Sequence, residues 1–495
     1  MVITNSWKTQ QSLTKKLLPY VLYSIFPLAL LHFYLYPFPP LPGSPAKDQF
    51  SIPTILPPFS SQNKELKSGN GLLDSPSLPP EEKENGNENG NLHEEIASLP
   101  TKEKESENGV LPEKESENRV LPEGKGSEEI SSTCDYANGE WVQEKKGPLY
   151  NGSSCGTIKD GQNCMSHGRP DMDYLYWRWK PRQCDLPRFD PRSFLQIFEG
   201  KHIAFVGDSM ARNQLESLLC MLGSLSPPNL VFTSGDDNKF RRWHIPSHNV
   251  VVSVYWSPFL VKGIEKTSDG NQDYNKLFFD SIDERWGSDL DTIDMVVLSI
   301  GHWYLHPAIY HDGDVTLGCH ALDSMNCTDV PFFDVYGKAF NTTLKAIIQR
   351  KLGSEGKGID VVVTTFSPHH FEGEWDKLGA CPRTKPFMEE EKSLEGMDAQ
   401  MREVQVEEVE KAKILLNADK NVLPKVRLAA VDVTKLALLR PDGHPGPYMY
   451  FNPFADGIKE RVQNDCVHWC LPGPIDTWNE IMLDVMTRWH TSSMK

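Results

Sequence analysis

The sequence predicts an α/β domain whose sheet carries helices on both faces. Apolar runs that suit buried strands alternate with helical patterns from residue 202 to residue 490, and such alternation is typical of a sheet covered on both sides. The predicted strands span 202–207, 295–301, 359–366 and 426–433, and the predicted helices span 209–223, 335–351, 388–416 and 475–490. Residues 207–209, 301–303 and 367–370 lie at strand ends, where α/β sheets bind ligands.

Residues 17–36 predict a single membrane-spanning helix, which leaves residues 1–16 as a cytosolic N-terminus. This stretch contains no Asp, Glu, Lys or Arg and is long enough to cross a ~30 Å hydrocarbon core. Lys8, Lys15 and Lys16 precede it, so the positive-inside rule places the rest of the chain across the membrane, in a type II topology. A cleaved signal peptide is the alternative, but the following segment FPPLPGSP lacks a small-x-small cleavage site.

Residues 37–132 predict a disordered stem. They are rich in Pro, Glu, Asn, Ser and Gly and poor in aromatic residues, so they cannot bury enough apolar surface to offset the entropy of ordering. The decapeptide EKESENGVLP at 103–112 is repeated as EKESENRVLP at 113–122, a unit too short and polar for a solenoid. We interpret this repeat as a local duplication in a spacer.

The chain's 10 cysteines all lie at or after Cys134, on the side that the topology places in the lumen. Disulfides persist in such a compartment, and an even count permits five bridges. Residues 133–187 are also dense in Trp, Tyr and Gly and predict a small, disulfide-rich subdomain. The remaining residues, 188–495, form the predicted α/β domain.

Three glycosylation sequons agree with a lumenal domain, at Asn151, Asn326 and Asn341. The formal net charge is −17, but much of the acidic excess lies in the stem and says little about a ligand of the folded domain. No basic surface of the kind that binds nucleic acid is evident.

The segment FVGDSMARNQ, residues 205–214, places Ser209 between a buried strand and the first turn of a helix. A serine there can face solvent at the sheet edge, and the helix N-terminus offers N–H groups to a developing oxyanion. Asp208 and Ser209 are equally good helix caps. The segment alone does not distinguish a nucleophile from a cap.

A nucleophilic serine needs a base that a third group orients. In QNDCVHWC, Asp465 precedes His468 by three residues, which puts both side chains on one face if the segment forms a helical turn. Cys466 and Cys470 flank the pair and could fix it by disulfides. His444, two residues after Asp442, is the rival base, in a segment that reads as a turn or ligand-contact loop.

The neighbouring His369 and His370 lack the surrounding ligand pattern of a metal site, so we expect no metal.

Together these motifs resemble the plant trichome birefringence-like family of polysaccharide O-acetyltransferases. The resemblance covers residues 134–495 and is carried by FVGDSMARNQLESLLC, DCVHWCLPGPIDTWNEIML, QNCMSHGRPD, YWRWKPRQCDLPRFDP, YWSPFLVK and SIGHWYL. The chain looks most like the branch that acetylates xyloglucan and mannan. The resemblance implies an SGNH/GDSL-esterase-like three-layer domain in the Golgi lumen, anchored by one helix.

The resemblance also implies a chemistry, in which Ser209, His468 and Asp465 form the triad. Ser209 takes an acetyl group from a donor, acetyl-CoA or a carrier derived from it and supplied in the Golgi, and a hydroxyl of a wall polysaccharide then receives it. Xyloglucan, on its side-chain galactose, is the expected acceptor, and mannan or glucomannan is the alternative. No tightly bound cofactor is expected.

The sequence offers several candidates for the groups that donate hydrogen bonds to the oxyanion. The Ser209 N–H is the first candidate, Arg212 and Asn213 are one turn into the helix, and the resemblance adds Gly301 and His302 at a neighbouring strand end. No G-x-N-D block typical of GDSL hydrolases is present.

Two other function classes stay open. A polysaccharide acetylesterase would use the same triad with water as the acceptor, and a non-catalytic glycan-binding wall protein would keep the fold without the chemistry. Four tryptophans are candidates for contacts with sugar rings or for the core, namely Trp177, Trp179, Trp303 and Trp469.

Overall fold

A computed structural model describes residues 134–235, 239–267, 272–322, 325–352, 358–418 and 425–493. The predicted N-terminus, membrane span and stem, residues 1–16, 17–36 and 37–132, lie outside these ranges. Among the helices of the described ranges, none is both long and apolar enough to cross a bilayer.

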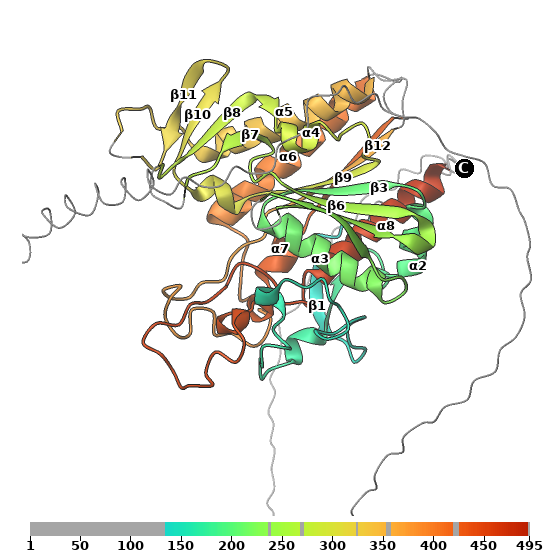
Figure 1. The fold of residues 1–495 in the computed structure, drawn as a ribbon, viewed down its shortest axis with the longest axis vertical. Coiled ribbons are helices and arrows are strands. Elements are labelled where there is room, and N and C mark those ends of the chain that lie inside the picture. The colour runs from blue at the N-terminus through green and yellow to red at the C-terminus, as the bar shows by residue number, and fades with distance from the viewer. Residues whose placement is uncertain are drawn as a thin grey trace, which may run out of the picture. The chain divides into compact units, whose positions relative to one another are not determined.

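A seven-stranded sheet forms the centre of the domain (Figure 1), in the order β13-β12-β9-β3-β6-β5-β4. The strands from β13 to β6 are parallel, and β5 and β4 add an antiparallel edge. Their bounds are β3 His202–Gly207, β4 Asn229–Ser234, β5 Phe240–Ile245, β6 Val250–Trp256, β9 Met295–Ser299, β12 Ile359–Thr364 and β13 Val426–Val431. The parallel part carries the carboxyl ends at which the candidate site lies.

Helices cover both faces of this sheet (Figure 1). One layer contains α2 Pro191–Ile197, α3 Ser209–Gly223 and α8 Asp476–Ser493, and the opposite layer contains α5 Phe332–Leu352 and α6 Gly396–Ala418. Side chains alternate between the two resulting cores, because successive residues of a strand point to opposite faces. In β3, Ile203 and Phe205 pack on the side of α3, whereas Ala204 and Val206 pack on the side of α5.

The predicted three-layer α/β arrangement is therefore confirmed. The strand β3 and the helix α3 have the predicted bounds, while β9, β12 and β13 each end two residues earlier than predicted. Helix α6 begins at Gly396 rather than at 388. Gly396 has φ +60°, a left-handed conformation that ends the preceding loop.

A second, four-stranded sheet was not predicted. Its order is β11-β10-β8-β7, with bounds β7 Val261–Ile264, β8 Asn275–Ile282, β10 Ala308–Asp312 and β11 Val315–His320. It packs beside α5 (Figure 1). Two short helices, α4 Glu284–Gly287 and α7 Thr434–Leu438, and 3-10 turns at Asp160–Gln162, Asp173–Leu175, Pro246–His248, His302–Leu305, Pro441–Gly443 and Pro447–Met449 complete the fold.

The cysteine-rich segment forms a small antiparallel sheet of β1 Gly139–Gln143 and β2 Trp177–Pro181. All ten cysteines are paired, as the even count permitted, in the bridges Cys134–Cys184, Cys155–Cys220, Cys164–Cys470, Cys319–Cys327 and Cys381–Cys466. Only the first of these lies wholly within residues 133–187. Two others tie that segment to α3 and to the segment after His468, so it is fastened to the catalytic domain rather than closed on itself.

Candidate active site

The turn from β3 into α3 holds the backbone of the GDS motif tightly against the neighbouring strand. Gly207 has φ +158°, and a Cβ atom at this position would lie 1.8 Å from the carbonyl oxygen of Ser299. The Asp208 N–H donates to the same carbonyl at 3.2 Å. Glycine is therefore required at 207, where β3 ends alongside β9.

Asp208, not Ser209, caps helix α3. Its Oδ1 accepts a hydrogen bond from the Met210 N–H at 2.9 Å, and its Oδ2 accepts one from the Gly301 N–H at 2.9 Å. Burial raises the pKa of this carboxyl to about 6, against the opposing effect of those two hydrogen bonds. Because the cap is supplied by its neighbour, the half-buried Ser209 hydroxyl is left for other interactions.

Asp465 and His468 meet as the spacing predicted, although the segment is not helical. The Asp465 Oδ2 accepts from the His468 Nδ1–H at 2.7 Å. Its Oδ1 accepts from the backbone N–H groups of Val467 and His468, at 3.0 and 2.9 Å. This side-chain-to-backbone turn, rather than a helix, brings the two side chains together.

The protonation of this pair follows from its geometry. Burial alone would raise the pKa of Asp465, but the His468 imidazole and the two backbone N–H groups outweigh it and hold that pKa well below its usual range. The carboxylate can only accept, so the proton of neutral His468 is on Nδ1 and a lone pair is on Nε2. Nε2 is buried and has no hydrogen-bond partner among the described residues. An oriented imidazole with an unused basic nitrogen is the arrangement that a general base requires.

Asn213 joins helix α3 to the residue that follows His468. Its Oδ1 accepts from the Trp469 N–H at 2.8 Å, and its Nδ2 donates to the Trp469 carbonyl at 3.3 Å. Asn213 is fully buried and lies four residues after Ser209, on the same side of the helix. Asn213 thus ties the helix that begins at Ser209 to the segment that carries His468.

No hydrogen bond yet joins Ser209 Oγ to His468 Nε2. Catalytic hydrogen bonds are often long or poorly aligned before substrate binds.

His444, the rival base, contacts the backbone of His468 and not its imidazole ring. Its Nδ1–H donates to the His468 carbonyl at 2.7 Å, and its Nε2 lies 2.7 Å from Nδ1 of His370. A hydrogen bond between the two rings requires the proton of His370 on Nδ1, and the His370 Nε2 lies 2.8 Å from the Leu438 carbonyl. Burial, followed by the charge of His370, lowers the pKa of His444 well below its usual range. Both of its nitrogens are engaged, so His444 is not available to Ser209.

The residues predicted to bind the oxyanion have different hydrogen-bond partners in the structure. The Gly301 N–H already donates to Asp208, and the Asn213 amide is engaged with Trp469. We therefore correct the interpretation of both, from oxyanion donors to residues that position the site. His302 donates its Nε2–H to the Ser367 carbonyl at 2.9 Å, and burial lowers its pKa to about 3.

Arg212 keeps a possible electrostatic role. It is buried, its Nε has no partner within the described ranges, and its guanidinium lies 5.6 Å from the centre of the Trp256 ring.

Two disulfides fix the segment that carries the pair. Cys466 is bonded to Cys381 and Cys470 to Cys164, as the flanking positions suggested. Arg169, which the sequence did not single out, adds a third tie from the N-terminal segment, since its Nη1 donates to the His444 carbonyl at 2.8 Å. The only local sign of this residue was its place in QNCMSHGRPD, and nothing in that segment indicated its distant partner.

The remaining predicted residues are distributed over the domain. Trp179 and Trp469 are fully buried core residues, whereas Trp177 and Trp303 are half-buried. His370 is buried and contacts His444, which donates to the His468 carbonyl. His369 is exposed. Within the described ranges, no group of three His, Cys, Asp or Glu side chains is arranged to hold a metal ion.

The three sequons differ in exposure. Asn151 and Asn326 are exposed. Asn341 is half-buried on α5, and its Nδ2 donates to Glu408 at 2.8 Å.

Comparison with known proteins agrees with this architecture. Residues 186–485 match the family described as "GDSL/SGNH-like Acyl-Esterase family found in Pmr5 and Cas1p", and residues 132–185 match the PMR5 N-terminal domain. Xyloglucan O-acetyltransferase 1 of Populus trichocarpa is 64% identical over 369 residues, which cover 74% of this chain and 84% of that protein.

Two Arabidopsis thaliana proteins extend the comparison. Xyloglucan O-acetyltransferase 1 is 58% identical over 72% of this chain and 81% of its own length. Protein trichome birefringence-like 25 is 41% identical over 73% of this chain and 78% of its own length. With its Asp-oriented histidine beside a GDS serine, and with a family match over most of the described residues, this chain belongs to the PC-esterase family of GDSL/SGNH-like acyl-esterases.

Proposed function

We propose that this protein is an O-acetyltransferase that esterifies hydroxyl groups of xyloglucan. Relatives at 58–64% identity are named for that activity. The observation that carries the chemistry is the unpartnered Nε2 of His468, whose Nδ1–H is held by Asp465. Ser209 at the start of α3 is the nucleophile that this base serves.

The first half-reaction transfers the acetyl group to the enzyme. His468 Nε2 takes the proton from Ser209 Oγ while Oγ attacks the carbonyl carbon of the acetyl donor. The C–O or C–S bond to the donor's leaving group then breaks, and the imidazolium returns the proton to that group. The product is acetyl-Ser209 with a neutral His468. Asp465 keeps the Nδ1 proton in place throughout and stabilises the imidazolium.

The second half-reaction uses the same groups in the opposite direction. His468 Nε2 takes the proton of a sugar hydroxyl, whose oxygen attacks the carbonyl carbon of acetyl-Ser209. The bond to Oγ breaks, Oγ recovers the proton, and the acetylated polysaccharide leaves. Water in place of the sugar hydroxyl would release acetate, so the acceptor decides between transferase and esterase.

The charge on the tetrahedral intermediate needs donors that are not already committed. The Ser209 backbone N–H at the positive end of α3 is the first of these. The Arg212 guanidinium, three residues further along the same helix, adds a positive charge nearby. Removing one preorganised donor raises such a barrier by about 3 kcal/mol.

Several features of the proposal concern the cellular setting. The acetyl donor is acetyl-CoA or a carrier derived from it, and the acetylated position is the side-chain galactose. Residues 17–36 anchor the protein in the Golgi membrane, and the catalytic domain faces the lumen. It is glycosylated at Asn151 and Asn326. Asn341 is glycosylated too if its hydrogen bond to Glu408 breaks.

The test compares the full chain with Ser209→Ala in an acetyl-transfer assay. Deacetylated xyloglucan oligosaccharides, mannan and xylan are each incubated with an acetyl donor, and mass spectrometry measures the gain of acetyl groups. We expect transfer to xyloglucan by the parent chain and none by Ser209→Ala. Ser492→Ala, an exposed serine near the end of α8, is the matched control and should retain activity.

Each alternative has its own outcome in this assay. If the parent chain transferred acetyl groups to mannan in preference to xyloglucan, mannan would be the acceptor. Release of acetate from acetylated xyloglucan without transfer would identify an esterase. Equal transfer by Ser209→Ala and the parent would exclude the acetyl-serine mechanism.

A further inference from the structure

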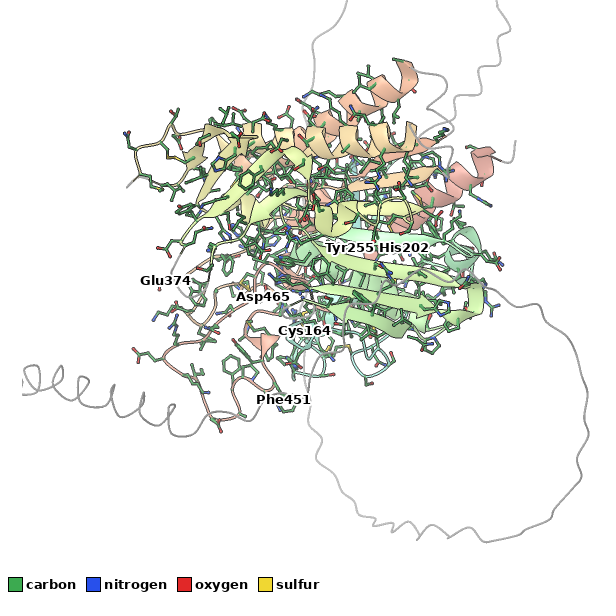
Figure 2. The ribbon with its side chains drawn as sticks, turned by 45° about the horizontal axis from the view of Figure 1, so that its top comes forward. Cys164, His202, Tyr255, Glu374, Phe451 and Asp465 are labelled. Carbon is green, nitrogen blue, oxygen red and sulfur yellow. A yellow bond between two sulfur atoms is a disulfide. The ribbon has the colours of Figure 1, made fainter. Side chains whose placement is uncertain are left out.

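A loop outside the triad begins and ends at the catalytic aspartate. The Gly446 N–H donates to the Asp465 carbonyl at 2.8 Å, and the Asp465 N–H donates to the Gly446 carbonyl at 3.0 Å. Residues 447–463 therefore leave the site and return to it, and we call them the 447–463 loop. Figure 2 labels Asp465 and, farther down in the picture, Phe451 of this loop.

The 447–463 loop is fastened near its two ends. The His167 Nδ1–H donates to the Tyr448 carbonyl at 2.8 Å, and the Asn452 N–H donates to the His167 carbonyl at 3.0 Å. At the other end, the Val462 N–H donates to the Asp376 carbonyl at 2.9 Å. A surface held in this way loses little conformational entropy when a ligand binds.

Residues of this loop line an open pocket of about 570 Å³ whose lining mixes polar and apolar groups. Two rings, Tyr450 and Phe451, contribute to it while 48% and 71% exposed. Large aromatic side chains left in water next to a cavity commonly mark a binding surface. Amide groups for hydrogen bonding come from Asn452 and Gln463, and the Tyr450 hydroxyl donates to the Gln463 side chain across the cavity.

The charges of the lining are balanced. Arg461 is paired with Asp376 at 2.8 Å, and the cavity adds one further cation, Lys459, and one anion, Asp456. A strongly charged ligand would find no net opposite charge there. Rings for the apolar faces of sugars, amides for their hydroxyls and no net charge suit a neutral polysaccharide.

The two ends of the pocket lining are close to Asp465, one along the chain and the other through the pairing of Gly446 with Asp465. Gln463 lies two residues before Asp465 and Pro447 directly follows Gly446, and neighbouring Cα atoms are ~3.8 Å apart, so both ends of the lining adjoin the catalytic aspartate. A polymer seated on the rings can extend from the loop to His468.

We propose that the 447–463 loop is an acceptor subsite that holds a neutral polysaccharide chain through Tyr450 and Phe451. This inference rests on the proposed transfer function. The loop binds sugars away from the reacting hydroxyl and so contributes to acceptor affinity and not to the chemistry at Ser209.

The experiment measures kinetics of the full chain with Phe451→Ala, Tyr450→Ala and Tyr450→Phe. For both alanine variants we expect KM for xyloglucan oligosaccharides to rise roughly tenfold. The rate at which donor alone acetylates Ser209, followed by intact-protein mass spectrometry, should be unchanged. Tyr450→Phe keeps the ring and should stay close to the parent. Phe232→Ala, a 50% exposed ring on β4, is the matched control and should leave KM unchanged.

A binding measurement separates the subsite from the reaction. Calorimetry with the Ser209→Ala chain should show xyloglucan oligosaccharide binding that Phe451→Ala weakens by a similar factor, and a polygalacturonate of equal length should bind less well. Unchanged KM and affinity in Phe451→Ala and Tyr450→Ala would overturn the subsite, as would tighter binding of the charged polymer. A parent chain that binds xyloglucan but never transfers acetyl would instead overturn the proposed function.

Discussion

Replacing Asp465 with asparagine alters one atom of the proposed catalytic pair and reverses which ring nitrogen of His468 carries the proton. Asparagine can keep its carbonyl oxygen towards the backbone N–H groups of Val467 and His468, which Oδ1 accepts in the parent at 3.0 and 2.9 Å. Its NH2 group then replaces Oδ2, 2.7 Å from His468 Nδ1. Two donors cannot face each other, so the imidazole proton moves to Nε2.

The expected loss follows from this tautomer. With a proton on Nε2, His468 cannot accept the proton of Ser209 unless it returns to the other tautomer. The variant loses a charge-assisted hydrogen bond, about 1.5–3 kcal/mol, and must break the new amide–imidazole hydrogen bond to react. A barrier increase of about 4–5 kcal/mol corresponds to a roughly 10³–10⁴-fold lower kcat. Stability should fall by only about 1 kcal/mol, because a neutral amide–imidazole hydrogen bond replaces the charge-assisted one and the turn keeps its backbone hydrogen bonds.

The assay is the initial rate of acetyl transfer to xyloglucan oligosaccharides, with thermal melting of the same samples. Asp185→Asn, at an exposed aspartate in the N-terminal segment, is the matched control and should keep the parent rate. If Asp465→Asn retained kcat within tenfold of the parent, the carboxylate would not set the tautomer of His468, and the mechanism derived from this pair would be wrong.

Three further predictions address the supports of the site. Gly207→Ala should prevent accumulation of folded protein, measured as soluble yield, because the added methyl group would lie 1.8 Å from the Ser299 carbonyl oxygen; a normal yield would contradict the close packing of β3 on β9. Asn213→Ala should lower kcat at least tenfold and destabilise the fold by about 1–3 kcal/mol, seen in urea unfolding, because it leaves the buried N–H and carbonyl of Trp469 unpaired. Burial raises the pKa of Asp476 to about 7, above the ~3.9 of an unfolded chain, so the fold binds an extra proton between these values. Stability should therefore fall by up to about 4 kcal/mol as pH rises from 4 to 7, and Asp476→Asn should flatten that slope in urea unfolding.

The parts of the fold that could be predicted are those with a local signal. Strand β3 and helix α3 have their predicted bounds because a continuous apolar run, a glycine and an aspartate cap follow one another within a few residues. The second sheet could not be predicted in the same way. Its strand β10 forms a local hairpin with β11 but pairs in parallel with β8. Helix α4 and strand β9 lie between β8 and β10 in the sequence, so no local signal indicated that pairing.

The candidate site shows the same division. The contact of Asp465 with His468 could be predicted because it spans three residues, even though a turn and not a helix forms it. The roles of Gly301 and Asn213 could not be, because each depends on a partner more than 90 residues away, at separations of 93 and 256. Their positions, one turn into the helix for Asn213 and at a strand end for Gly301, suggested oxyanion donors, whereas their tertiary partners already use those groups.

These long-range hydrogen bonds also explain how one short motif accommodates both a cap and a nucleophile. Asp208 divides its two carboxylate oxygens between the first turn of α3 and the Gly301 N–H after β9. The same side chain thereby caps the helix and joins the ends of two parallel strands at the edge where the site lies. Since the helix obtains its cap from residue 208, the hydroxyl at 209 has no structural duty in α3 that would compete with catalysis. The backbone N–H of Ser209 remains at the helix N-terminus, where a developing negative charge on the substrate is most favourably placed. The aspartate before the serine thus supplies both the helix cap and the bond to the neighbouring strand end, and it leaves the Ser209 hydroxyl uncommitted.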